Sequence, residues 1–213
     1  MGVIMDKELI DEINYEIQLL IKIGFYSDDE ILEIIDDEFI EEDISKDLIS
    51  SLLLENKENL DELKEDSDDF IRLSKAFDDL TKENIISIHN AGYDIEEGIQ
   101  DSFELFTHLK NNKYEPIGFC FYTFEDIENA IEENSLNIAF GDFEYDEKKG
   151  LEIAKMIVKT LKDYGFEINW CESVDEIIEI ENFNWKKQFD GKEYSMDGAL
   201  EDFIRLNSEE NEQ

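Results

Sequence analysis

Hydrophobic positions in residues 1–66 recur with the period of a helix. The first apolar stripe predicts a helix that ends near Gly24, and it consists of Ile10, Ile13, Ile17 and Leu20. Ser27 and Glu30 have the spacing of a capping box, which predicts the start of a second helix. The inward side of that helix is expected to hold Ile31, Ile34 or Ile35, and Phe39. Ser45 is expected to begin a third helix, whose inward residues are Leu48, Ile49, Leu52 and Leu53.

From residue 67 onward, short apolar runs alternate with helical stretches, the first of which carries Phe70, Leu73, Phe77 and Leu80. The runs predict strands at residues 85–89, 117–122, 136–140, 167–170 and 177–180. The intervening patterns predict helices at residues 99–109, 124–133 with Thr123 as cap, 147–164 and 196–206. This alternation predicts an α/β fold, with α+β as the alternative, in which helices cover a mixed sheet of about five strands. The short interval between the last two strands predicts a hairpin.

These patterns divide the chain into an acidic helical region (1–66), a mixed α/β domain (67–206) and a polar tail (207–213). The domain carries four blocks: NAGY (90–93), GFCFYTFEDIENAI (118–131), LNIAFGDFE (136–144) and GFEINW (165–170). With these blocks, the stretch from about Asp69 to Trp185 resembles an uncharacterised bacterial family, a domain of unknown function. The resemblance implies the α/β fold and brings no activity with it. Members of that family carry His and Gln before the Asp of the middle block, where this chain has Thr123 and Glu125, so no catalytic role is transferred to that block.

The excess of acidic residues is densest in the helical region. The chain has 58 acidic and 19 basic side chains, a net charge of -39, yet it is 41% hydrophobic with 15 Phe and 8 Tyr. That apolar content indicates a folded core, because disordered acidic chains are poor in aromatic residues. Residues 1–68 contain 23 acidic and 5 basic side chains, and the other residues contain 35 and 14. Because this surplus repels phosphates, we expect a basic protein partner, with no direct binding to nucleic acid or to a membrane.

The carboxylates around the second helix are the candidate partner-binding residues. Helix positions three or four apart lie about 5–6 Å from each other, so acids at these spacings form a negative face. We assign partner binding to Asp28, Asp29, Glu33, Asp36, Asp37, Glu41, Glu42 and Asp43. The hypothesis is an acidic inhibitor or immunity-type protein that neutralises a basic partner, such as a nuclease, with carboxylates in the place of DNA phosphates. In a second interpretation, the chain is a regulatory domain whose charge serves only solubility.

A different hypothesis is an enzyme of unknown reaction with a pocket formed by His89, Asn90 and Tyr93, since ligands of α/β proteins bind where strands end. The competing interpretation is that Asn90 and Gly92 form a turn and that His89 packs beside it. A further hypothesis is a catalytic dyad of Cys120 and His89. However, we expect both Cys120 and Cys171 to be buried and unreactive among apolar residues.

The sequence predicts no cofactor and no dedicated metal site, and it does not favour an enzyme. Asp142, Glu144, Asp146 and Glu147 alternate like a calcium loop but lack its spacing and its glycine. No phosphate-binding loop or dinucleotide-binding fingerprint is present. The N-terminus lacks the pattern of a signal peptide and no apolar run approaches the ~20 residues that span a bilayer, so we expect a cytoplasmic protein. The oligomeric state is left open.

Overall fold

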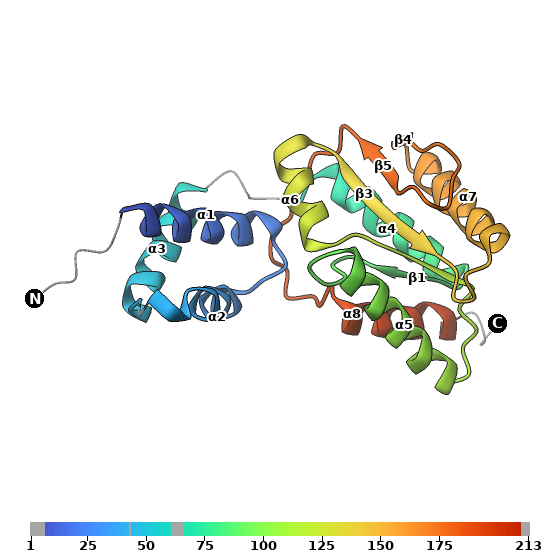
Figure 1. Ribbon diagram of the computed structural model, residues 1–213, viewed down its shortest axis with the longest axis horizontal. Coiled ribbons are helices and arrows are strands. Elements are labelled where there is room, and N and C mark those ends of the chain that lie inside the picture. The colour runs from blue at the N-terminus through green and yellow to red at the C-terminus, as the bar shows by residue number, and fades with distance from the viewer. Residues whose placement is uncertain (1–6, 43, 61–65, 210–213) are drawn as a thin grey trace, which may run out of the picture. The chain divides into compact units, whose positions relative to one another are not determined.

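The structure is a computed structural model that describes residues 7–42, 44–60 and 66–209. The chain forms two compact units, which are described separately (Figure 1). Unit 1 consists of Met1–Asp66 and Lys186–Lys192, and unit 2 consists of Ser67–Trp185 and Glu193–Gln213. Within the described residues, no helix combines the length and the apolar character that crossing a bilayer requires.

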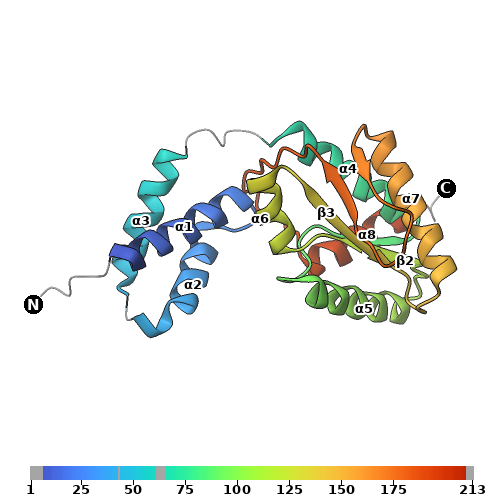
Figure 2. The same ribbon diagram turned by 45° about the horizontal axis from the view of Figure 1, so that its top comes forward.

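Unit 1 is helical, as the spacing of its apolar residues predicts. Its elements are α1 (Lys7–Ile23), α2 (Asp28–Glu38), the short 3-10 helix η1 (Ile40–Glu42) and α3 (Lys46–Asn59). The three α-helices contact one another in pairs (Figure 2). The expected capping box is confirmed: the Glu30 N–H donates to Ser27 Oγ (3.2 Å), and the Ser27 N–H donates to the Glu30 carboxylate (2.7 Å). Ser45 caps α3, as expected.

The core of unit 1 is built mainly from aliphatic side chains. Its buried residues include Ile13, Ile17, Leu20, Ile31, Ile35, Phe39, Ile49, Leu52 and Leu53. The sequence left open whether Ile34 or Ile35 faces the core from α2. Ile35 does, because it is buried and Ile34 is only half-buried. Ile10 and Leu48, both expected to face inward, are half-buried as well. The helical period therefore identifies the buried face of each helix, and only residues at the edges of these faces are less buried than expected.

Unit 2 carries the α/β architecture that the sequence predicts. Its elements are α4 (Asp68–Lys82), β1 (Ile85–Ile88), α5 (Ile95–Asn111), β2 (Gly118–Phe121), α6 (Phe124–Glu133), β3 (Leu136–Gly141), α7 (Glu147–Asp163), β4 (Glu167–Asn169), β5 (Ile178–Glu181) and α8 (Met196–Glu209). The five strands form one mixed sheet in the order β1-β2-β3-β5-β4. β1 and β2 are parallel, and all other neighbours are antiparallel. The expected hairpin of the last two strands is confirmed as the β4–β5 pair.

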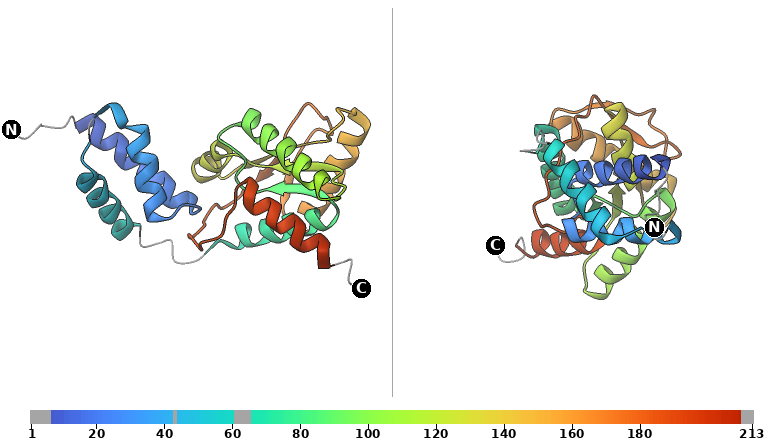
Figure 3. Two further views of the ribbon diagram at one scale, coloured as in Figure 1. Left: turned by 90° about the horizontal axis from the view of Figure 1, so that it is seen from below. Right: turned by 90° about the vertical axis from the view of Figure 1, so that its left-hand side faces the viewer.

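Helices cover both faces of this sheet. On one face, α5 and α8 enclose a core that includes Phe119 and Phe121 of β2 and Phe203 of α8. On the opposite face, Phe77 of α4 contacts the ring of Tyr122, directly after β2. Figure 3 shows α8 between α5 and α4, and α8 contacts both of these helices. The core of unit 2 is thus rich in aromatic rings.

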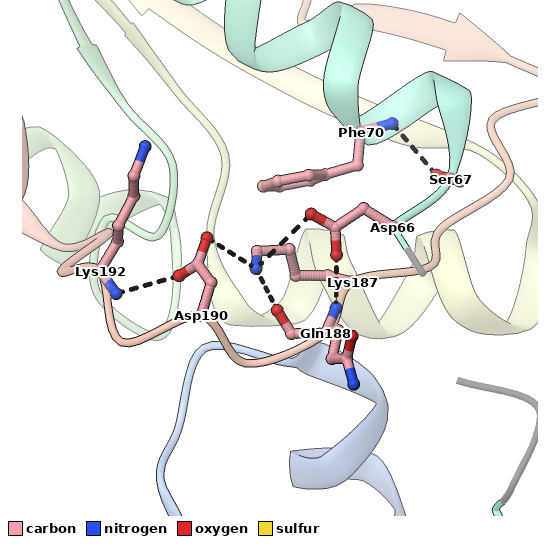
Figure 4. Close-up of polar contacts among 7 residues, drawn as sticks. All are labelled: Asp66, Ser67, Phe70, Lys187, Gln188, Asp190 and Lys192. Carbon is pink, nitrogen blue, oxygen red and sulfur yellow. Dashed lines mark hydrogen bonds and ion pairs between the residues drawn. The ribbon is translucent and has the colours of Figure 1, made fainter. Parts of the chain in front are cut away.

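The segment Lys186–Lys192 belongs to unit 1, although it is far from the helices of that unit in the sequence. It passes close to Gly24 at the end of α1, where a Cβ atom would lie 2.1 Å from the Lys187 carbonyl oxygen. The Lys187 side chain is fully buried, and its Nζ lies 3.2 Å from Asp190 and 3.8 Å from Asp66 (Figure 4). The Gln188 N–H also donates to Asp66, over 2.7 Å. A buried lysine between two carboxylates therefore fastens this segment, a feature that no sequence pattern indicated.

Candidate functional site

The acidic residues of α2 form two rows that differ in their contacts. Asp29, Glu33 and Asp37 follow one another at intervals of four residues, and all three side chains are exposed. No hydrogen bond or ion pair is found for these three within the described residues. Because four residues advance a helix by about 6 Å, these carboxylates form a line on one helix face. We call these three residues the acidic row.

The second row of α2 is neutralised within unit 1. Asp28 forms an ion pair with Lys57 of α3 (2.6 Å), and Asp36 forms one with Lys46 at the start of α3 (2.8 Å). The pKa of Lys46 is raised, first by its hydrogen bond to Asp36 and then by the negative charge of Asp36, with smaller contributions from Glu33 and Asp37. Two of the eight predicted contact residues are therefore engaged with unit 1 itself.

The remaining predicted contact residues lie at and after η1. Glu42 is exposed in this short helix. Glu41 belongs to the same helix, and its side chain is outside the described part of the structure. Asp43 also lies outside the described residues. The acidic row and Glu42 are consequently the predicted residues that the structure places on the surface of unit 1 without engaging them in ion pairs among its described residues.

The alternative site around His89 is found at the carboxyl ends of the parallel strands β1 and β2. His89 Nδ1 lies 2.8 Å from the hydroxyl of Tyr122. The Ala91 N–H donates to the Tyr122 carbonyl oxygen (3.0 Å), which continues the pairing of the two chain segments beyond the strands. Tyr93 does not join His89: it is 54% exposed and stacks on Phe124 at a ring distance of 5.4 Å. Tyr93 therefore does not belong to the same cluster as His89, with which the sequence analysis grouped it.

Aromatic rings surround the imidazole of His89. Phe77 stacks on it with centroids 4.7 Å apart, and Phe70 lies at 5.9 Å. Tyr194, which precedes α8, contacts the ring edge-on at 5.6 Å. Burial raises the pKa of Tyr122 well above its ordinary value, so its phenol stays protonated and acts as a hydrogen-bonding group. This environment agrees with the interpretation of His89 as a packed residue, and Gly92 adopts the positive φ of +63° that suits the expected turn.

The dyad of Cys120 and His89 does not form. In the parallel register Cys120 is paired with Ser87, and its Sγ lies 3.5 Å from the Ser87 hydroxyl. Burial raises the pKa of Cys120 to about 12, which leaves almost no thiolate at neutral pH. The expectation that Cys120 is buried is confirmed. The same expectation for Cys171 is wrong, because Cys171 lies just beyond the edge strand β4 and is exposed.

Asp126 is a buried carboxylate that the sequence analysis did not select. It accepts hydrogen bonds from the Thr123 N–H (3.0 Å) and the Thr123 hydroxyl (2.9 Å) in the capping box of α6. Burial raises its pKa, and the hydrogen bonds from Thr123 and Asn137 oppose that shift. The sequence predicted Thr123 as the cap of this helix, but it did not indicate that the acid three residues later is buried.

The carboxylates in the loop between β3 and α7, which resembles a calcium loop in its alternation of acids, form hydrogen bonds within the same segment. Asp142 accepts the backbone N–H groups of Glu144 (2.9 Å) and Asp146 (3.0 Å), and Asp146 accepts that of Lys149 at the start of α7 (3.0 Å). Among the described residues, no group of three or more His, Cys, Asp or Glu side chains is arranged to hold a metal ion. The carboxylates therefore order the loop and cap the helix.

An acidic helical unit and an α/β unit with a five-stranded mixed sheet define the class of this protein. The family model described as Domain of unknown function (DUF6891) matches residues 6–189, and the chain belongs to this family. The match includes the helical region as well as the stretch from Asp69 to Trp185 that carries the resemblance. No curated protein and no solved structure matches the chain.

Proposed function

We propose that this protein is an acidic inhibitor or immunity-type protein that binds a basic protein partner through α2 of unit 1. The observation that carries the proposal is the acidic row, Asp29, Glu33 and Asp37. The row is exposed and evenly spaced, whereas the neighbouring acids Asp28 and Asp36 are paired with lysines. Among the described residues, Lys46 and Lys57 form their ion pairs with Asp36 and Asp28, not with the acidic row. The acidic row keeps its charge for a partner.

The line of fixed negative charge in the row supports a partner that normally contacts nucleic acid. Duplex DNA carries one negative charge per ~1.7 Å of its axis. A row of carboxylates about 6 Å apart on a rigid helix is sparser, but it is fixed in position and lies in a region of high negative charge. Such a field accelerates association with a basic cleft and makes the rate sensitive to salt. A nuclease or another nucleic-acid-handling protein fits this requirement.

The experiment is salt-dependent capture from a lysate of the source organism, with purification of the captured protein. The test variant is Asp29→Asn/Glu33→Gln/Asp37→Asn. The matched control is Glu55→Gln/Glu58→Gln/Glu201→Gln, which removes the same charge from other exposed positions. We expect one basic protein to be captured by the wild type and the control but not by the test variant, and to bind again when purified. Equal capture by all three proteins, or no basic protein that binds again, contradicts the proposal.

A further inference from the structure

Unit 2 contains a cavity of about 460 Å³ at the end of the sheet where β3 ends and β2 begins. Gly141, the last residue of β3, lines it together with Gly150 of α7 and Ile99 of α5. The volume lies within the roughly 300–1,000 Å³ of ligand pockets. The His89 cluster lies at the other end of β2, so this cavity is a separate site.

Aromatic rings form part of the wall of this cavity. Tyr145 stacks on Phe103 with centroids 5.7 Å apart and an angle of 20° between the rings. Phe103 in turn lies 6.1 Å from the ring of Phe119, and all three residues line the cavity. Tyr145 is 84% exposed although its ring is held against Phe103. An exposed ring fixed in this way offers a face to a ligand.

The charged residues of the wall are acidic. Asp142, Asp146, Glu147 and Asp175 line the cavity, and none of the described residues that line it is basic. Lys149 pairs with Glu144 and its charge also interacts with Asp142 and Asp146, whereas Lys148 pairs with Glu152. Among the described residues, no ion pair is found for Glu147 or Asp175, so these two carboxylates supply the excess negative charge of the wall. At the N-terminus of α7, Asp146 caps the helix by accepting the Lys149 N–H, and the carboxylates of Asp146 and Glu147 offset the partial positive charge of the helix end.

Aromatic faces and carboxylates that outnumber the nearby basic groups are the surroundings that stabilise an organic cation. A guanidinium group fits best, because it is planar, stacks on rings, is weakly hydrated and pairs with carboxylates in two-pronged geometry. We propose that this cavity receives an arginine side chain of the basic protein partner. Only the source of the arginine rests on the proposed function. The preference for a guanidinium follows from the cavity alone.

The probe is arginine with an acetylated amino group and an amidated carboxyl group, titrated into the full-length protein and followed by two-dimensional NMR. Matched probes are the corresponding derivatives of lysine and of citrulline, which replace the guanidinium by an ammonium or by a neutral urea. We expect the arginine derivative to shift the resonances of Tyr145, Gly150 and Asp175. The lysine derivative should bind more weakly and the citrulline derivative should not bind. Equal binding of citrulline, or no shift at these residues, overturns the proposal.

Two pairs of variants test the wall directly. Tyr145→Asn removes the ring and keeps a residue that tolerates the φ of +56° at this position, whereas Tyr145→Phe keeps the ring. We expect Tyr145→Asn to weaken arginine binding at least about fivefold and Tyr145→Phe to bind like the wild type. Asp175→Asn should weaken binding, and Glu55→Gln, a substitution in unit 1, should not. Unchanged binding by Tyr145→Asn and Asp175→Asn overturns the proposal.

The acidic-row variant, Asp29→Asn/Glu33→Gln/Asp37→Asn, distinguishes a failure of the proposed function from a failure of the arginine-binding proposal. It should bind the arginine derivative like the wild type while losing the captured protein. If arginine shifts the cavity residues but no basic partner is captured, the proposed function fails and the proposed protein source of the arginine fails with it. If partner capture depends on the acidic row but Tyr145→Asn leaves the partner's affinity unchanged, the cavity proposal alone fails.

Discussion

The two units of this chain handle their charge in different ways. Unit 1 has a small aliphatic core, and its excess acid is concentrated on helices that offer few lysines as partners. Unit 2 encloses a sheet with many aromatic side chains and uses several acids internally, such as Asp126 in a helix cap and Asp142 in a loop. Carboxylates with internal hydrogen bonds have a structural role. The acidic row of unit 1 has none among the described residues, and for this reason we propose that row as the binding surface.

The comparison also shows where each unit depends on single residues. Unit 1 depends on the segment Lys186–Lys192, which we call the return segment. It fits only beside a glycine, and it contains a buried lysine. Unit 2 depends on dense packing around the sheet, and a Cβ atom on Gly98 of α5 would lie 2.3 Å from the Phe121 ring. Substitutions at such positions therefore test the stability of the two units separately.

The largest expected contrast is between the two cysteines of unit 2. Cys171 is exposed and should react with a thiol reagent at neutral pH within the time expected for a free thiol. Cys120 is fully buried with a pKa raised to about 12, so it should react only when unit 2 unfolds. Mass spectrometry of the timed reaction measures both. Rapid labelling of Cys120 in the native protein contradicts the description of this core.

The next largest effect concerns the glycine beneath the return segment. Gly24→Ala places a Cβ atom 2.1 Å from the Lys187 carbonyl oxygen at a φ of +76°. We expect this substitution to lower the free energy of unfolding of unit 1 by at least about 3 kcal/mol, from overlap and backbone strain together. Chemical denaturation followed by circular dichroism measures the change.

Gly191→Ala is the matched control, because Gly191 has the same φ of +76° and nothing within 4 Å of its Cβ position. Only backbone strain of about 1–2 kcal/mol should appear. Equal losses in the two variants would show that the return segment does not pack against the end of α1. Neither variant should accelerate the labelling of Cys120, which lies in unit 2.

A smaller effect is expected from the buried lysine. Lys187→Met leaves Asp66 and Asp190 without their buried cation, and both carboxylates are partly exposed, so we expect a loss of about 2 kcal/mol. Lys57→Met removes an exposed lysine that pairs with Asp28 and should cost at most about 1 kcal/mol. Thermal denaturation compares the two. A loss no greater in Lys187→Met than in Lys57→Met contradicts a structural role for Lys187.

The smallest effect is a change in pH dependence from Asp126. Burial raises its pKa in the folded protein above the ordinary 3.8, so the folded state retains this proton to a higher pH than the unfolded state does. The contribution of Asp126 is therefore most favourable below pH 3.8 and declines as the pH rises through the folded pKa. The difference in unfolding free energy between Asp126→Asn and the wild type should follow this direction. A difference that is constant with pH, or of opposite sign, contradicts the assigned burial.

Much of the fold follows from local patterns in the sequence. Ser27, Ser45 and Thr123 begin helices where their spacing to the next acid or apolar run predicts, and the β4–β5 hairpin follows from the short interval between its strands. These features depend on neighbours a few residues apart. The α/β class and the mixed sheet follow from the order of such elements.

The features that the sequence did not reveal depend on distant residues. The ion pair of Lys187 with Asp66 joins positions that no local pattern relates. The register of β1 and β2 places Ser87 beside Cys120, and two residues further along each segment His89 contacts Tyr122. The sequence of a single strand does not determine the register in which it pairs. The exposure of Cys171 results from its place beyond an edge strand. The acidic face of α2 was predictable. Its division into a row paired with lysines and a row without ion pairs among the described residues required the positions of Lys46 and Lys57.

If the acidic row attracts a basic partner, the association rate of the purified partner depends on the charge of the row. Stopped-flow measurements should compare the wild type, the acidic-row variant and the matched control at several salt concentrations. We expect the acidic-row variant to associate about tenfold more slowly at low salt, and this difference to shrink as salt screens the charges. Equal rates for the acidic-row variant and the control across the whole salt range would contradict the proposal.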